Sequence, residues 1–190
     1  MTTQHKIIFS GPVGAGKTTA IGKVSDIPPV ITDVRAGTSE EELKDTTTVA
    51  LDYGVLRLGA GERVHLYGTP GQDRFDFMWE ILSEGAIGLF LLVTNRRRDP
   101  VGDLRFFLDA FRPLILRTQL AVGVTGVDVN PEPGLPAYRR ALEAAGLSVP
   151  MFEVDARRRE DVATLIQAML LSEDPGLAGG ADGQLRASAR

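Results

Sequence analysis

Short apolar runs and amphipathic stretches take turns along this chain as far as residue 171. The runs have the length and composition of strands buried in a parallel sheet. They cover residues 6–10, 49–58, 62–67, 85–94, 120–125 and 151–154. Between them, apolar residues repeat at helical spacing, most clearly over 101–115, 138–145 and 162–169. Strands that alternate with helices in this way predict an α/β fold with a doubly wound sheet.

Three irregular stretches refine this prediction. Gly59-Ala60-Gly61 separates two strand-like runs and predicts a hairpin, so we expect six strands, mostly parallel, with one antiparallel edge strand and helices on both faces. Ser25–Thr48 lacks periodicity and contains Pro28-Pro29, which predicts a long mobile loop. The polar, Gly/Ala-rich end predicts a single domain over residues 1–172 and a disordered tail over 173–190.

The segment Gly11–Thr18, between the first strand and the first helix, fits the pattern G-x-x-x-x-G-K-[ST] of a phosphate-binding loop. Its backbone N–H groups and the helix N-terminus would hold phosphate oxygens. Lys17 would reach the β- and γ-phosphates, and the Thr18 hydroxyl would bind Mg²⁺. The predicted nucleotide-binding residues of this region are Gly11, Val13, Gly14, Ala15, Gly16, Lys17, Thr18 and Thr19.

Composition narrows the class of protein. A net charge of −4 gives no overall electrostatic footprint for nucleic acid, which we do not expect as a partner. The absence of cysteine excludes disulfides, thiolate metal sites and thiol lipidation. The longest apolar run, residues 86–93, is too short to span a bilayer. We therefore expect a cytoplasmic protein, which reaches a membrane only through a partner.

A second motif, Gly68-Thr-Pro-Gly71-Gln72, follows the strand that contains His65-Leu66-Tyr67. In sequence and position it resembles the third motif of Ras-like small GTPases, and is most similar to MglA-like bacterial GTPases of the conservon-encoded (CvnD) type. The resemblance implies a Ras-like P-loop fold in which the Gly71 N–H contacts the γ-phosphate and Gln72 orients the attacking water.

The resemblance has one departure that concerns the metal. The aspartate that supports the Mg²⁺ water shell in Ras-like proteins is Gly68 here. Asp52 on the preceding strand is a hypothetical substitute, the alternative being an ordinary solvated aspartate. The resemblance also selects Thr48 as the second metal ligand, with Thr46 and Thr47 left open. Thr18 and Thr48 are thus the predicted metal ligands, and Lys17, Gln72 and Thr48 the predicted catalytic residues.

Base recognition is expected after the fifth strand, at Thr125-Gly126-Val127-Asp128. By resemblance, Asp128 accepts two hydrogen bonds from guanine, Thr125 replaces an asparagine, and Gly126 lacks the lysine stem that covers the base. The Ala156 N–H, after the last strand, would contact guanine O6. The run Arg96–Arg98 has the pattern of a solvated charge cluster.

Together these features predict a GTPase switch that binds GTP or GDP with Mg²⁺, hydrolyses GTP slowly and needs an activating partner. The resemblance implies a roadblock/LC7-domain partner within a sensor-kinase-associated complex. Two alternatives stay open: a guanine-nucleotide scaffold with negligible hydrolysis, and a P-loop small-molecule kinase or ATPase.

Overall fold

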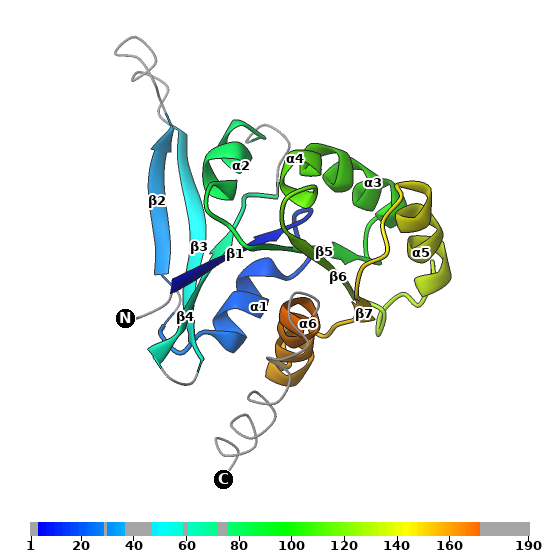
Figure 1. The fold of residues 1–190 in the computed structure, drawn as a ribbon. Coiled ribbons are helices and arrows are strands. Elements are labelled where there is room, and N and C mark those ends of the chain that lie inside the picture. The colour runs from blue at the N-terminus through cyan, green and yellow to red at the C-terminus, as the bar shows by residue number, and fades with distance from the viewer. Residues whose placement is uncertain (1–3, 29, 37–46, 59–60, 72–75, 172–190) are drawn as a thin grey trace.

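The computed structural model describes residues 4–28, 30–36, 47–58, 61–71 and 76–171. Within these residues the chain forms a seven-stranded sheet in the order β2-β3-β4-β1-β5-β6-β7, flanked by helices (Figure 1). The strands are β1 (Gln4–Ser10), β2 (Val30–Ala36), β3 (Thr47–Arg57), β4 (Arg63–Gly68), β5 (Gly88–Thr94), β6 (Gln119–Thr125) and β7 (Met151–Glu153). The helices are α1 (Lys17–Val24), α2 (Asp76–Ser83), α3 (Pro100–Ala110), α4 (Arg112–Ile115), α5 (Leu135–Ala144) and α6 (Arg159–Leu171).

Five strands form the parallel part of the sheet. β1 pairs in parallel with both β4 and β5, and β6 pairs in parallel with β5 and β7. Every residue of β5 is buried, as its unbroken apolar sequence predicts for a central parallel strand. Because these strands are parallel, their carboxyl ends share one edge of the sheet, where open α/β folds bind ligands.

Helices cover both faces of the sheet, as the alternating pattern predicts. One core cluster joins residues of α1 and α6 to one face, including Ile21 and Leu165. The other joins α3, α4 and α5 to the opposite face, together with Trp79 of α2. Trp79 stacks on Phe111 with ring centroids 4.9 Å apart. The α/β class, the mostly parallel sheet and the two helical layers are therefore confirmed.

The sheet differs from the prediction at its antiparallel side. Part of the predicted loop Ser25–Thr48 is β2, which pairs antiparallel with β3, so the described sheet has seven strands and β3 is not its edge. The β-branched residues of Val30-Ile31-Thr32-Asp33-Val34 favour a strand. The neighbouring prolines and polar residues concealed this signal. Residues 37–46 of the predicted loop and the predicted tail 173–190 lie outside the described residues.

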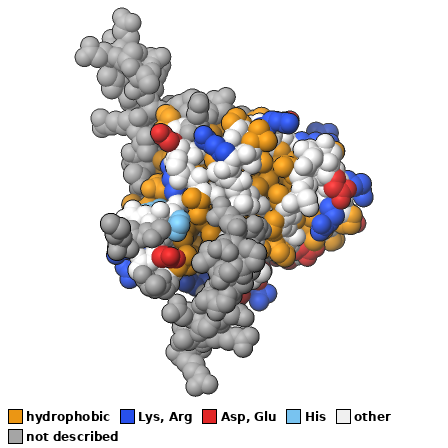
Figure 2. All heavy atoms as spheres, viewed as in Figure 1, with side chains coloured by type: hydrophobic (Ala, Val, Ile, Leu, Met, Phe, Trp, Pro, Cys, Tyr) orange, Lys and Arg blue, Asp and Glu red, His pale blue; other side chains and the backbone are white. Residues whose placement is uncertain are grey.

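On the face shown in Figure 2, basic and acidic side chains of the described residues are interspersed with apolar and neutral ones. None of the helices in the described ranges combines the length and the apolar character needed to cross a membrane.

Candidate functional site

The loop Gly11–Gly16 connects the carboxyl end of β1 to the N-terminus of α1. Gly16 immediately precedes the helix with φ of 96°, a left-handed conformation that glycine adopts without strain. The Ala15 N–H donates to the Pro12 carbonyl at 3.2 Å, which closes the loop into a tight turn. The loop therefore has the strand–turn–helix setting that a phosphate-binding loop requires.

Lys17 lies inside this loop, with only 8% of its surface exposed. Its Nζ donates to the carbonyl oxygens of Gly11 at 2.7 Å and Pro12 at 2.9 Å. Burial lowers the pKa of Lys17 to about 8, an effect that the negative charge of Asp52 partly offsets. The ammonium group is thus desolvated and aimed at the loop, where an anion would interact with it strongly.

Asp52 of β3 lies beside Thr18 at the start of α1. The Thr18 hydroxyl donates to Asp52 Oδ2 at 2.6 Å. Asp52 and Gly68 are cross-strand partners, and a Cβ on Gly68 would lie 2.9 Å from the Cβ of Asp52. The missing side chain at 68 therefore gives Asp52 the room to face Thr18. This geometry supports the hypothesis that Asp52 takes the place of the missing aspartate.

The donor set at Thr18 and Asp52 suits a hard cation, because Mg²⁺ prefers carboxylate and hydroxyl oxygens. Within the described ranges, no cluster of three or more His, Cys, Asp or Glu side chains forms a metal site made by protein groups alone. Mg²⁺ commonly binds through one or two protein oxygens together with phosphate oxygens and water. The pair of oxygens therefore fits a Mg²⁺ ion that arrives with a nucleotide.

Gly71 approaches the phosphate-binding loop closely. A Cβ on Gly71 would lie 2.6 Å from the Val13 nitrogen and 2.8 Å from Lys17 Nζ. The structure thus brings Gly71 to the place where a phosphate contact was predicted. Gln72 lies outside the described residues, so its predicted role stays a prediction.

Thr48, the predicted second metal ligand, lies within β3, where its backbone pairs with Arg35 of β2. Thr48 and Asp52 are four positions apart, which corresponds to about 13 Å along a strand. The described geometry does not bring Thr48 next to Thr18, and its role as a ligand remains a prediction.

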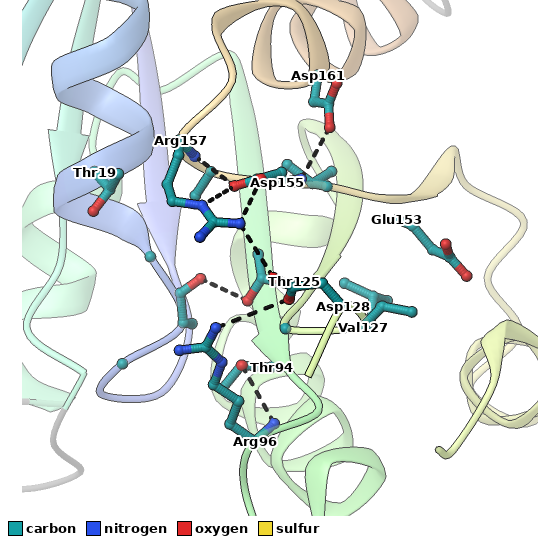
Figure 3. Close-up of a pocket in the computed structure, with 17 residues that line it drawn as sticks. Thr19, Thr94, Arg96, Thr125, Val127, Asp128, Glu153, Asp155, Arg157 and Asp161 are labelled. Atoms are coloured by element: carbon teal, nitrogen blue, oxygen red, sulfur yellow. Dashed lines mark hydrogen bonds and ion pairs between the residues drawn. The ribbon is translucent and has the colours of Figure 1, made fainter. Parts of the chain in front are cut away.

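A pocket of about 460 Å³ continues from the loop towards the ends of β6 and β7 (Figure 3). Seven of the predicted nucleotide-binding residues line it, namely Gly14, Ala15, Gly16, Thr19, Thr125, Asp128 and Ala156. Gly16 and Ala156 are in close contact, since a Cβ on Gly16 would lie 2.8 Å from the Ala156 Cβ. Segments that are far apart in the sequence therefore meet in one site, as predicted.

Thr125 lines the pocket and connects the phosphate-binding loop to β5. Its buried hydroxyl lies 3.0 Å from the Ala15 carbonyl oxygen and 3.2 Å from that of Val93, so its one proton is shared between these two acceptors. The hydroxyl is therefore directed at the phosphate-binding loop and at β5. The contact ties Thr125 to the phosphate-binding loop, and its predicted contact with the nucleotide stays a prediction.

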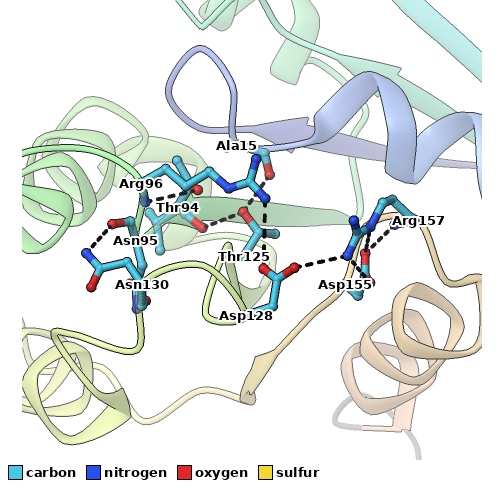
Figure 4. A network of polar contacts seen from close by, with 10 residues as sticks. Ala15, Thr94, Asn95, Arg96, Thr125, Asp128, Asn130, Asp155 and Arg157 are labelled. Carbon is cyan, nitrogen blue, oxygen red and sulfur yellow. Dashed lines mark hydrogen bonds and ion pairs between the residues drawn. The ribbon is translucent and has the colours of Figure 1, made fainter.

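The loop that carries Asp128 is fixed by Asn95 and Asn130 (Figure 4). Asn95 Nδ2 donates to the Asn130 carbonyl at 2.9 Å, and Asn130 Nδ2 donates to the Asn95 carbonyl at 2.9 Å. Tyr138 of α5 donates from its hydroxyl to Asn95 Oδ1. These reciprocal bonds tie the end of β5 to the Asp128 loop, which gives an exposed carboxylate a defined position.

Two arginines that the sequence did not single out as site residues flank Asp128. Arg157 Nη2 lies 3.1 Å from Asp128 Oδ2, and Arg96 Nη2 lies 3.9 Å from Oδ1. The Arg96 side chain also occupies the space above Gly126, where an added Cβ would lie 2.9 Å from Arg96 Cγ. The interpretation of Arg96 as part of a solvated charge run is therefore incomplete. Its place directly after β5, at the edge of the sheet where Asp128 lies, was the available signal.

The fold and the loop define the class of protein: an α/β P-loop NTPase-like protein whose site opens at the carboxyl edge of its parallel strands. Residues 9–130 match the family described as "Conserved hypothetical ATP binding protein". This match covers more than half of the chain, which therefore belongs to that family. Nucleotide binding through the phosphate-binding loop is the property that the family and the site share.

The chain is also similar to "Uncharacterized protein MJ1339" of Methanocaldococcus jannaschii. The two are 36% identical over 81 residues, which are 43% of this chain and 45% of the relative. The alignment thus spans less than half of the relative's length.

The family assignment corrects the resemblance drawn from the sequence. The ATP-binding family is distinct from the MglA-like and CvnD-type small GTPases, although both are P-loop NTPases, so that identification is wrong. The error came from Gly68–Gln72 and Asp128, which are short motifs. The family description indicates ATP and gives no support to guanine specificity. The roadblock-domain partner depended on the resemblance alone and stays untested.

Proposed function

We propose that this chain is a P-loop nucleoside triphosphatase that binds ATP together with Mg²⁺ and hydrolyses it slowly. The observation that carries the proposal is the continuity of the site. The buried ammonium of Lys17 and the Thr18–Asp52 pair lie at one end, and a pocket of about 460 Å³ leads from the loop to Asp128. The description of the family supports adenine as the base.

The proposed role of each site residue follows from its position relative to the phosphates. Lys17 would place a positive charge on the terminal phosphates, and the loop N–H groups would bind their oxygens. Thr18 and Asp52 would hold Mg²⁺, which supplies charge neutralisation when bound. Among the arginines whose side chains the structure describes, none forms a hydrogen bond or ion pair with a side chain of residues 11–18. Since additional positive charge at the phosphates accelerates this chemistry, we expect slow turnover.

A second candidate is a guanine nucleotide, favoured by Asp128. Its carboxylate lines the far end of the pocket, and side-chain exposure of 53% leaves it accessible to a base. A carboxylate with both oxygens free accepts two hydrogen bonds from guanine. Asp128 also pairs with Arg157, and adenine stays the first candidate because the family description names ATP.

The test is a parallel titration of the purified chain with fluorescent ATP, ADP, GTP and GDP, with and without Mg²⁺. The rate of phosphate release from ATP and GTP is then measured. We expect adenine nucleotides to bind more tightly and Mg²⁺ to strengthen binding of the triphosphate. Lys17→Ala should weaken binding by at least about 100-fold, because two or more charged hydrogen bonds are lost. Lys23→Ala, an exposed lysine on the same helix, is the matched control. Absence of binding to all four nucleotides would contradict the proposal.

A further inference from the structure

Two buried hydroxyl groups join the carboxyl ends of β1 and β4. The Thr69 hydroxyl donates to Ser10 Oγ at 2.8 Å, and the exposed fractions of Thr69 and Ser10 are 2% and 0%. The Thr69 N–H also donates to the Phe9 carbonyl at 2.8 Å, which continues the parallel ladder beyond the last pair, Phe9 and Gly68. Two hydrogen bonds therefore fix Thr69 against the end of β1.

This hydroxyl pair lies between the two segments that form the phosphate end of the site. Ser10 immediately precedes the phosphate-binding loop, and Thr69 stands two residues before Gly71. A proline fixes its own φ and restricts the residue before it to extended conformations, so Pro70 makes the step from Thr69 to Gly71 stiff. A shift of Thr69 is therefore passed on to Gly71, where an added Cβ would lie only 2.8 Å from Lys17 Nζ.

The order of the strands decides which part of a nucleotide reaches Gly71. The pocket opens at the ends of β6 and β7, and β4 lies on the opposite side of β1 from both strands (Figure 1). Three spacings of about 4.8 Å separate β6 from β4, which is about 14 Å in all. A nucleotide with its base in the pocket and its phosphates over the loop directs its terminal phosphate towards β4. A diphosphate is one phosphate shorter and ends before this place.

We propose that the Ser10–Thr69 hydroxyl pair holds Gly71 against the phosphate-binding loop, and that the site thereby selects a triphosphate over a diphosphate. Ser10 and Thr69 are positioning residues, because they act through Gly71. A buried hydroxyl that loses its partner bears the full cost of desolvation, so removal of either hydroxyl favours a displacement of Thr69. This inference rests on the proposed nucleotide binding and specifies how that site responds to the length of the phosphate chain.

The experiment measures dissociation constants for ADP and for a non-hydrolysable ATP analogue, both with Mg²⁺. Thr69→Val and Ser10→Ala should each weaken binding of the analogue by about fivefold and that of ADP by less than about twofold. Thr69→Ser keeps the hydroxyl and should bind the analogue as the unsubstituted protein does. Thr118→Val is the control, because the Thr118 hydroxyl donates to the Leu114 carbonyl at 2.9 Å, at the amino end of β6 and away from the site.

The double variant tests whether the two hydroxyls act as a unit. Ser10→Ala combined with Thr69→Val leaves neither hydroxyl buried without a partner. Its loss of affinity for the analogue should therefore be no greater than that of either single variant. If the two losses add instead, Ser10 and Thr69 act independently, and the proposed pair is contradicted.

The outcomes also separate this inference from the proposed function. If the unsubstituted chain binds neither ADP nor the analogue, the proposed function fails and the inference with it. If both bind, and the single variants, folded by circular dichroism, keep the original ratio of the two dissociation constants, only the inference is overturned. Should these variants fail to fold, Pro70→Gly replaces them, because it keeps both hydroxyls and loosens only the step to Gly71. A loss confined to the analogue then supports the inference, and an unchanged ratio contradicts it.

Discussion

Different kinds of contact hold the two ends of the site. At the phosphate end, Lys17 is buried, and its hydrogen bonds go to backbone carbonyls of its own loop, five and six residues away. At the base end, Asp128 and Arg157 are more than half exposed and are held by side chains from separate loops. A backbone cradle depends on local sequence and can be recognised as a motif. Charge pairs between loops depend on tertiary structure, and a motif does not describe them.

The two ends of the site also contribute differently to the affinity for nucleotides and to the selectivity among bases. Every nucleotide carries the same phosphates, so the phosphate end supplies binding that does not distinguish bases. Exposed ion pairs contribute little to stability, typically less than about 1 kcal/mol. They can nevertheless decide between two ligands that differ only in donors and acceptors. We therefore expect substitutions at the phosphate end to have large effects on all nucleotides, and those at the base end to have smaller ones.

After Lys17→Ala, the largest effect is expected at Gly71, where a side chain would intrude on the phosphate end. A Cβ there would lie 2.6 Å from the Val13 nitrogen and 2.7 Å from the Pro12 carbonyl carbon. Gly71→Ala must therefore displace the phosphate-binding loop, and we expect all nucleotides to bind about 100-fold more weakly. Gly134→Ala is the matched control, because its added Cβ meets only Pro136 Cδ at an ordinary 3.6 Å. Equal affinities for the Gly71→Ala variant and the unsubstituted protein would show that the loop is not the phosphate site.

The next largest effect is expected at the Asp52–Gly68 pair. Asp52→Ala removes the carboxylate bonded to Thr18, so the gain in triphosphate affinity on adding Mg²⁺ should shrink by about tenfold or more. Asp52→Gly combined with Gly68→Asp moves a carboxylate to the partner strand, leaves no Cβ at position 52 to clash with the one added at 68, and should restore part of that gain. Asp109→Asn, an exposed aspartate on α3, is the control. If Mg²⁺ strengthens binding to Asp52→Ala as much as to the unsubstituted chain, Asp52 is not a metal ligand.

A pH dependence is expected from Lys17. Its pKa is lowered to about 8 chiefly by burial, so the free protein loses this positive charge above that pH. Bound phosphates favour the charged form of Lys17 and raise its pKa. Above about pH 8 the protein therefore takes up a proton when a nucleotide binds. Affinity should be flat below about pH 8 and then fall about tenfold per pH unit. Folding stability should change in the opposite sense: between about pH 8 and the ordinary value of 10.5 the unfolded chain binds more protons, which makes stability rise with pH.

Calorimetry in buffers of different ionisation enthalpy checks this expectation, because it measures the protons taken up on binding. We expect close to none at pH 7 and a rising number above pH 8. Lys17→Arg, which does not titrate in this range, is the control. An affinity that is constant up to about pH 9 in the unsubstituted protein would mean that Lys17 keeps its ordinary pKa.

The same contrast explains what could be predicted from the sequence. Local patterns predict the order of strands and helices and the phosphate-binding loop. The parallel topology then predicts that three residues from distant segments meet in one site, namely Gly16, Asp128 and Ala156. β2 was missed because its β-branched residues stand between prolines and a polar stretch. The guanine prediction took Asp128 as the acceptor of two hydrogen bonds. The pairing of this carboxylate with Arg157, 29 residues further along the chain, could not be read from either motif.

The smallest effect is expected for Arg96, whose side chain lies against Gly126 in the lining of the pocket. A guanidinium group stacked on a purine contributes roughly 0.5–1 kcal/mol at an exposed site, so Arg96→Ala should weaken ADP and GDP binding by about two- to fivefold. Because stacking uses the flat face that both purines share, the two losses should be equal. This distinguishes a residue stacked on the base from one that contacts its hydrogen-bonding edge, whose substitution should change the ratio of the two affinities. Arg98→Ala, an exposed arginine two residues further, should change neither affinity. An unequal loss on Arg96→Ala would assign this residue to the hydrogen-bonding edge of the base.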